Sequence, residues 1–311
     1  MNQAEHVPGA RAVKVSPKQL HGLSVISLTP FTDTGEVDVA SFRRLLDFYL
    51  AAGVHGITLL GIMGEVSKLT EADRDTVIET AVSHVAGRVP VTVGCSAPGT
   101  HQTLAFVRRA QAAGADAIMV APPNNTRNLD LVLDHYRAVS EVSELPLVVQ
   151  DEPTTTGVVL PPAFFGRVVQ QVPTARYVKV EEAPTLMKVS AIREAAQDKL
   201  GLFGGLGGMY FYEELARGAV GIMTGFAFPE VLVQVYERYQ AGDAEGARAC
   251  FYRYLPLIRF EAQLGVTGVA IRKEIFRMRG VIASAHVRQP APRIDERTLA
   301  ELTDLVGFLG L

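Results

Sequence analysis

The sequence is poor in cysteine, and it has no cluster of basic residues. Its two cysteines, Cys95 and Cys250, lie far apart and do not have the spacing of metal ligands. The histidines form neither an HxxxH nor an HExxH pattern, so we expect no metal site. The net charge is only −3, and basic residues gather nowhere, which argues against nucleic acid as a partner.

Long apolar segments are missing as well. No run is long enough to cross a bilayer, so no membrane contact is expected, and the N-terminus lacks the apolar segment of a signal peptide. Together with the few cysteines, this predicts a protein of a reducing compartment, most simply the cytoplasm. The 311 residues are 48% apolar, which is enough for one large α/β barrel or for two ordinary domains.

What the sequence does contain is one repeated unit. A short apolar run, a break of glycine, proline or polar residues, and an amphipathic helix follow one another along the chain. The apolar runs occupy residues 25–28, 57–60, 91–93, 117–120, 147–150, 177–180, 202–203 and 221–224. This pattern predicts a TIM barrel, in which parallel strands alternate with helices. An open doubly wound sheet is the alternative, but it requires GxGxxG after the first strand, where this chain has Thr29, Pro30 and Phe31.

The strand pattern stops after Phe228. Beyond it, residues 230–240, 243–263, 266–280 and 295–308 have the pattern of helices, the first of which completes the barrel. We therefore expect an N-terminal tail, a barrel, and a C-terminal helical extension that packs on the barrel; these occupy residues 1–20, 21–240 and 241–311.

Lys179 is an unusual residue for a buried strand. Side chains alternate along a strand, so Lys179 shares one face with Tyr177 and Glu181. The two valines between them suit the helix layer, so we expect Lys179 to point into the barrel. An amine in an apolar pocket can act as the nucleophile that forms a Schiff base with a carbonyl substrate. The alternative is a structural lysine that reaches solvent or pairs with Glu181 or Glu182.

The ends of other strands contain residues that could act together with Lys179, because the active sites of barrels lie at the C-terminal ends of the strands. After strand two, the glycines of residues 61–65 could present backbone N–H groups to a carboxylate. After strand five, Gln150 could orient a substrate, and Asp151 or Glu152 could be an acid or base. The glycines of residues 204–208 could hold a phosphate or carboxylate. Each segment could equally be an ordinary turn or polar loop.

Together these features resemble the dihydrodipicolinate synthase and N-acetylneuraminate lyase family. The matching segments are residues 61–65, 69–70, 121–123 and 153–157, and Lys179 with the glutamate that follows it. The resemblance covers nearly the whole chain. It implies a TIM barrel with a helical C-terminal extension, usually a homotetramer, that needs no cofactor. It also implies that Lys179 forms a Schiff base with a 2-keto acid, commonly pyruvate or a pyruvate-derived part of the substrate.

The sequence departs from the pattern of this family in the region of the site. Ile62 and Met63 replace two hydroxyl residues that usually bind the carboxylate of the keto acid. Gln150 replaces a tyrosine that transfers protons, and Thr155 replaces the arginine that binds the second substrate of the synthases. The tyrosine of the loop after strand four is absent as well. The pattern argues against dihydrodipicolinate synthesis and is similar to that of branches acting on 2-keto-3-deoxy sugar acids.

The sequence thus predicts a lyase that dehydrates or cleaves a 2-keto acid, with Lys179 as nucleophile and Glu181 or Asp151 as base. Gln150 would position a water or a hydroxyl. Substrate contacts are expected from Ile62, Met63, Gly64, Asp151, Thr155, Gly205 and Met223. One alternative is a sensor or regulatory protein that binds keto acids without turnover. A third hypothesis is a phosphate-handling barrel enzyme, but no Arg or Lys follows residues 204–208 before Arg217.

Overall fold

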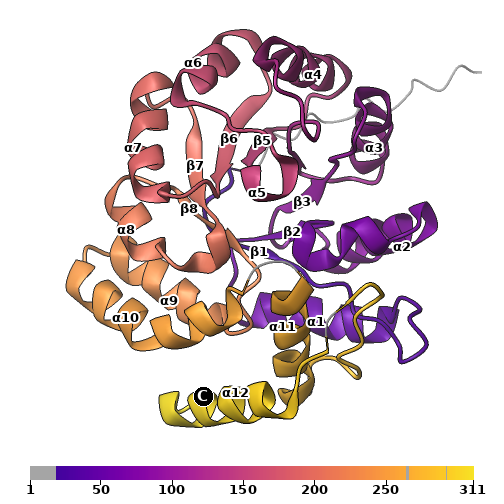
Figure 1. The fold of residues 1–311 in the computed structure, drawn as a ribbon, viewed down its shortest axis with the longest axis vertical. Helices are drawn as coiled ribbons and strands as arrows, with labels where there is room; N and C mark the ends of the chain where they lie inside the picture. Colours follow the sequence, from indigo (N-terminus) through magenta and orange to yellow (C-terminus); the bar gives the residue numbers. More distant parts are fainter. Residues whose placement is uncertain (1–18, 264–265, 292) are drawn as a thin grey trace, which may run out of the picture.

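The strands close into a parallel barrel in which each strand pairs with its neighbours in chain order and the last pairs with the first (Figure 1). The structure, a computed structural model, describes residues 19–263, 266–291 and 293–311, so nearly all of the predicted tail lies outside the described residues. The strands are β1 Gly22–Ile26, β2 Gly56–Leu59, β3 Val91–Gly94, β4 Ala117–Val120, β5 Leu147–Asp151, β6 Ala175–Val180, β7 Gly201–Gly204 and β8 Gly221–Thr224. The predicted TIM barrel is confirmed.

Helices separate the strands, and the longer ones form the outer layer of the barrel. They are α1 Val39–Ala51, α2 Glu71–Val85, α3 Thr100–Ala112, α4 Leu129–Val142, the short α5 Pro153–Thr156, α6 Pro162–Gln171, α7 Thr185–Ala195, α8 Phe211–Ala216 and α9 Pro229–Gln240. Short 3₁₀ turns lie at the end of the barrel where β2 and β7 finish; they are η1 Ile62–Gly64, η2 Val66–Lys68 and η3 Leu206–Gly208.

Local capping residues determine where these helices begin. At the start of α1, the Asp38 side chain accepts a hydrogen bond from the N–H of Ser41. At the start of α2, Thr70 and Asp73 form a capping box, in which each side chain accepts a hydrogen bond from the N–H of the other residue. One such cap contributes about 1 kcal/mol to helix stability. The caps fix the points at which the chain leaves the strand ends for the helix layer.

The barrel wall divides the core into two layers. The larger outer layer lies between strands and helices and includes Val178 and Val180 of β6. The inner layer fills the barrel and includes Phe203, against which Tyr177 packs with ring centroids 5.7 Å apart. The side chains of β6 therefore alternate as predicted, and Lys179 faces the interior of the barrel.

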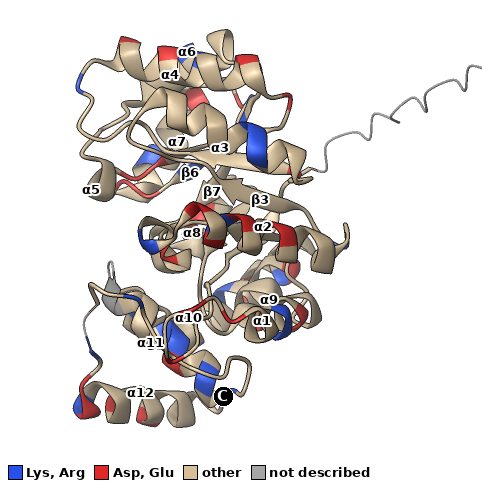
Figure 2. Cartoon of the chain, turned by 90° about the vertical axis from the view of Figure 1, so that its right-hand side faces the viewer, with Lys and Arg blue, Asp and Glu red and all other residues tan. Residues whose placement is uncertain are grey.

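The C-terminal extension reaches the end of the barrel at which the strands finish. Its helices are α10 Ala244–Glu261, α11 Val266–Met278 and α12 Glu296–Leu309. Helix α10 packs against α8, α9 and η3, and α11 packs against η1. Figure 2 shows that α10 and α11 lie between the barrel and α12. Within the described ranges, no helix is long and apolar enough to span a membrane.

Candidate active site

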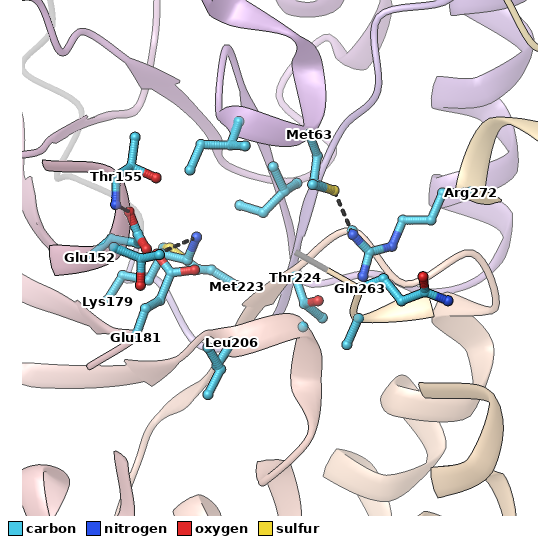
Figure 3. A pocket seen from close by; sticks show the side chains of 16 residues that line it. Met63, Glu152, Thr155, Lys179, Glu181, Leu206, Met223, Thr224, Gln263 and Arg272 are labelled. Carbon is cyan, nitrogen blue, oxygen red and sulfur yellow. Dashed lines mark hydrogen bonds and ion pairs between the residues drawn. The ribbon is translucent and has the colours of Figure 1, made fainter. Parts of the chain in front are cut away.

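A cavity of about 280 Å³ lies at the C-terminal ends of the strands, and Lys179 and Glu181 line it. Lys179 belongs to β6, and Glu181 follows that strand directly. Met63 of η1, Met223 of β8 and Arg272 of α11 line other parts of the same cavity (Figure 3). Residues that are distant in the sequence thus meet at the end of the barrel where an active site was expected.

Lys179, Glu181 and Gln150 form a connected group. The Lys179 Nζ lies 3.0 Å from Glu181 Oε2, and both side chains are largely buried. The Gln150 amide donates a hydrogen bond of 3.1 Å to the same oxygen. Gln150 and Lys179 are register partners on β5 and β6, so the sheet itself places their side chains next to each other. One carboxylate oxygen therefore contacts both the amine and an amide that holds it in place.

Gly205 contributes to this group through the space that it leaves free. A Cβ atom at residue 205 would lie 2.3 Å from Glu181 Cγ, a distance that no side chain tolerates. Gly205 does not line the cavity, whereas Leu206 and Gly207 do. The geometry does not bring Gly205 to the cavity where a substrate would lie, because the Glu181 side chain occupies the space next to Gly205.

Asp151 lies on the other side of the barrel wall from Gln150. It follows Gln150 in β5, so its carboxylate points outward, where the Lys188 Nζ of α7 lies 2.7 Å from Asp151 Oδ2. Burial raises the pKa of Asp151 to about 7, although Lys188 opposes this shift. The cavity is instead lined by Glu152, which shares the inward face with Gln150. The expectation that Asp151 contacts substrate or serves as base is corrected on these grounds.

The turn after β2 presents apolar side chains to the cavity. Ile62 and Met63 line it, as expected from their positions. Gly64 does not, because a Cβ atom there would point at the carbonyl oxygen of Ser27. The N–H groups of Gly64 and Glu65 donate to carbonyl groups within the turn, so the predicted carboxylate nest has to use the other N–H groups of residues 61–65 and stays a prediction.

A second cavity of about 380 Å³ adjoins the first. Ile62, Glu152 and Thr155 line both cavities, so they form the boundary between them. Gln150 lines only the second cavity, although it contacts Glu181 in the first. The Lys179 group therefore lies beside two adjoining cavities that share three lining residues.

Arg272 is the charged residue among the cavity-lining residues that the sequence analysis missed; Thr154, Thr224 and Gln263 are uncharged ones. Arg272 lies on α11, where Nε contacts Glu261 Oε2 at 3.3 Å and Nη1 contacts the sulfur of Met63. Its neighbour Lys273 bonds to Glu65 Oε1 at 2.6 Å, which ties the turn after β2 to the extension. The spacing of apolar residues along α11 could indicate that this helix is buried on one side. Only the packing of α11 on η1 shows which of its side chains reach the cavity.

A buried lysine–carboxylate pair in the cavity of a TIM barrel places this protein among the barrel enzymes. The chain belongs to the dihydrodipicolinate synthetase family, whose model matches residues 19–307. It is therefore an enzyme of the lyase type.

Relatives of known name or structure cover nearly the whole chain. An L-2-keto-3-deoxyarabonate dehydratase from Azospirillum brasilense is 33% identical, and the match covers 90% of this chain and 92% of that protein. The crystal structure of a dihydrodipicolinate synthase from Rhodopseudomonas palustris has 34% identity and a TM-score of 0.88, covering 95% of this chain and 99% of that chain. A prophage protein of the family from E. coli K12, solved in complex with pyruvate, has 26% identity and a TM-score of 0.87, covering 94% and 100%.

Proposed function

We propose that this enzyme dehydrates a 2-keto-3-deoxy sugar acid through a Schiff base on Lys179. The observation that carries this proposal is the 3.0 Å contact between Lys179 Nζ and Glu181 Oε2 inside the cavity. The likeness to a 2-keto-3-deoxyarabonate dehydratase supports the substrate class. The family member that was solved with pyruvate supports a 2-keto acid as the ligand.

The first part of the proposed reaction joins the substrate to the lysine. Glu181 accepts a proton from the Lys179 ammonium, and the free amine attacks C2 of the substrate. Glu181 then returns the proton to the C2 hydroxyl of the adduct, which leaves as water and produces an iminium ion. One carboxylate can serve both transfers because it lies within hydrogen-bond distance of the amine.

The second part removes water from the sugar chain. The iminium ion draws electrons from C3, so Glu181 can take a C3 proton and produce an enamine. The enamine expels the C4 hydroxyl group, which takes the proton from Glu181 and leaves as water. The remaining iminium ion, now conjugated to a C3–C4 double bond, is hydrolysed by water and releases the product and Lys179. Gln150 holds Glu181 in position through its 3.1 Å hydrogen bond.

Two measurements test this proposal. Incubation with pyruvate or a 2-keto-3-deoxy acid, followed by borohydride reduction and peptide mapping by mass spectrometry, is expected to show the adduct on Lys179. Incubation with a panel of 2-keto-3-deoxy pentonates and hexonates is expected to yield a product lighter by one water. Release of pyruvate and an aldehyde would instead identify retro-aldol cleavage, and the absence of any adduct in the folded protein would contradict the Schiff base.

The oligomeric state and the compartment remain predictions. A homotetramer follows only from the resemblance to the family, and analytical ultracentrifugation of the purified protein measures it directly. The cytoplasmic location follows only from the composition, and fractionation of the source cells tests it.

A further inference from the structure

Helix α11 carries two adjacent buried cations, Arg272 and Lys273, that differ in how many of their N–H groups have a hydrogen-bond acceptor. Lys273 is fully buried, and its Nζ donates to Glu65 Oε1 at 2.6 Å and to the His286 carbonyl oxygen at 2.8 Å. The same Nζ lies 4.1 Å from the ring centroid of Phe31. These contacts satisfy an ammonium group, so Lys273 has a structural role.

Arg272 is nearly as buried, with 3% of its surface exposed, but its guanidinium group is not satisfied. Its Nε contacts Glu261 Oε2, an oxygen that also accepts a hydrogen bond from the N–H of Ala227. Its Nη1 contacts only the Met63 sulfur, a weak acceptor, and its Nη2 has no hydrogen-bond partner among the described residues. A buried charged donor without a partner is costly, so such a group indicates a missing ligand.

The position of Arg272 indicates what that ligand is. Figure 3 shows Arg272 and Lys179 on opposite sides of the same cavity, with Met63 beside Arg272; the apolar Met223 also lines the cavity. Nε of Arg272 is held by Glu261 and one N–H of Nη1 contacts the Met63 sulfur, so Nη2 and the second N–H of Nη1 remain for a ligand. Two parallel N–H donors at this end match the two oxygens of a carboxylate.

We propose that Arg272 binds a carboxylate of the substrate end-on, opposite the lysine that binds its keto carbon. The assignment of the ligand as a keto acid rests on the proposed function, whereas the assignment of Arg272 as an anion site does not. The carboxylate is the one at the far end of a 2-keto-3-deoxy sugar diacid, because the carboxylate beside the keto group is bonded to the carbon that Lys179 attacks and stays on the lysine side of the cavity. Arg272 thereby selects substrates that carry a distal carboxylate, and Glu261 and Met63 hold its side chain in place.

The first experiment uses acids that cannot form a Schiff base. Lactate and glutarate are added to the wild-type protein, and the rise in melting temperature is measured. Arg272→Met can fail to fold because it leaves Glu261 buried and unpaired, so the test variant is the double substitution Arg272→Met with Glu261→Gln. Arg277→Met is the control, since Arg277 is exposed on the same helix and pairs with Glu274.

We expect at least one of these acids to stabilise the wild-type protein and the Arg277→Met protein but not the double variant. Equal stabilisation of the double variant would overturn the proposal, and so would the absence of any stabilisation of the wild-type protein. The outcome is independent of Lys179 chemistry, so it separates this proposal from the proposed function.

The second experiment distinguishes the two carboxylates. The concentrations of pyruvate and of 2-oxoglutarate that give half-maximal borohydride trapping on Lys179 are measured in wild type, the double variant and Arg272→Lys. Loss of the charged hydrogen bonds is expected to raise the half-saturating concentration about ten- to hundred-fold, with a smaller rise for Arg272→Lys. A rise for 2-oxoglutarate alone supports binding of the distal carboxylate by Arg272, whereas an equal rise for both acids or unchanged values for both refute the proposal.

Discussion

Lys179 and Lys188 are both buried near the end of β6, and both contact carboxylates, yet only one of them faces a cavity. Their exposed fractions are 6% and 8%, so burial does not distinguish them. Lys188 contacts Asp151 and Glu182 on the outer side of the barrel wall, where helices cover it. Lys179 contacts Glu181 beside a volume that can hold a substrate. Access to a cavity, and not burial, is therefore the feature that distinguishes the lysine that we propose as nucleophile from Lys188.

The largest expected effect is that of removing Lys179. Because no other group in the first cavity can form the iminium ion, we expect Lys179→Ala to lower turnover of a 2-keto-3-deoxy acid by about 10⁴-fold or more. Lys188→Met is the matched variant and is expected to keep the borohydride-trapped adduct and most of the activity. Full turnover by Lys179→Ala, or an adduct on Lys188 in the wild-type protein, would reverse the roles assigned to the two lysines.

The carboxylates beside the two lysines provide the next test. Glu181→Gln keeps the shape of the side chain but removes the group that transfers protons, so we expect kcat to fall about 10²- to 10⁴-fold. Adducts with pyruvate should still form, more slowly. Glu182→Gln, beside Lys188, is expected to change kcat less than about three-fold, within the range of surface substitutions. Similar losses of kcat in both variants would argue that Glu181 contributes only a negative charge near Lys179 and does not transfer protons.

The sequence was sufficient to predict the barrel and the direction of Lys179, because both follow from periodicity. A closed parallel barrel is the fold that repeated βα units build, and alternation of side chains along β6 sends Lys179 inward between two outward valines. The same alternation argues against the predicted role of Asp151 as a base or substrate contact. If Gln150 points inward, Asp151 points outward and Glu152 inward again.

Other parts of the site depend on contacts between distant segments. Arg272 lies 93 positions after Lys179 in the sequence and reaches the cavity only because α11 packs on η1. Nothing in the local sequence shows that Gly205 makes room for the Glu181 side chain rather than for an anion, since the two residues belong to neighbouring strand ends. Such contacts follow from tertiary packing, which a local pattern does not contain.

The structural lysines are expected to differ from each other in stability. Lys273→Met leaves Glu65 buried without its closest cation and should lower the free energy of unfolding by about 3 kcal/mol. Lys188→Met should cost less, about 1 kcal/mol near pH 6, because the pKa of Asp151 is already raised to about 7 and the carboxyl can take up a proton. Urea unfolding at equal protein concentration measures both values. Equal losses would show that Asp151 remains charged without Lys188.

The last expected effect depends on pH and concerns Glu214, a carboxyl group on the outer side of the wall. Glu214 is 1% exposed, and burial raises its pKa from 4.5 to about 8. Between these values the folded protein keeps a proton on Glu214 that the unfolded chain releases, so the contribution of Glu214 to stability is greatest below about pH 4.5 and falls as the pH rises to about 8. Glu214→Gln removes this titration without changing the shape of the side chain.

We therefore expect the melting temperatures of wild type and Glu214→Gln to be similar near pH 5 and to diverge as the pH rises. The variant should be more stable by roughly 5 °C at pH 8.5, and the gap should stop growing above the folded pKa. Glu237→Gln, an exposed position on α9, is the control and should follow the wild type at every pH. A constant difference across the range would mean that Glu214 does not hold the extra proton, because only a group that titrates differently in the folded and unfolded states changes the slope of stability with pH.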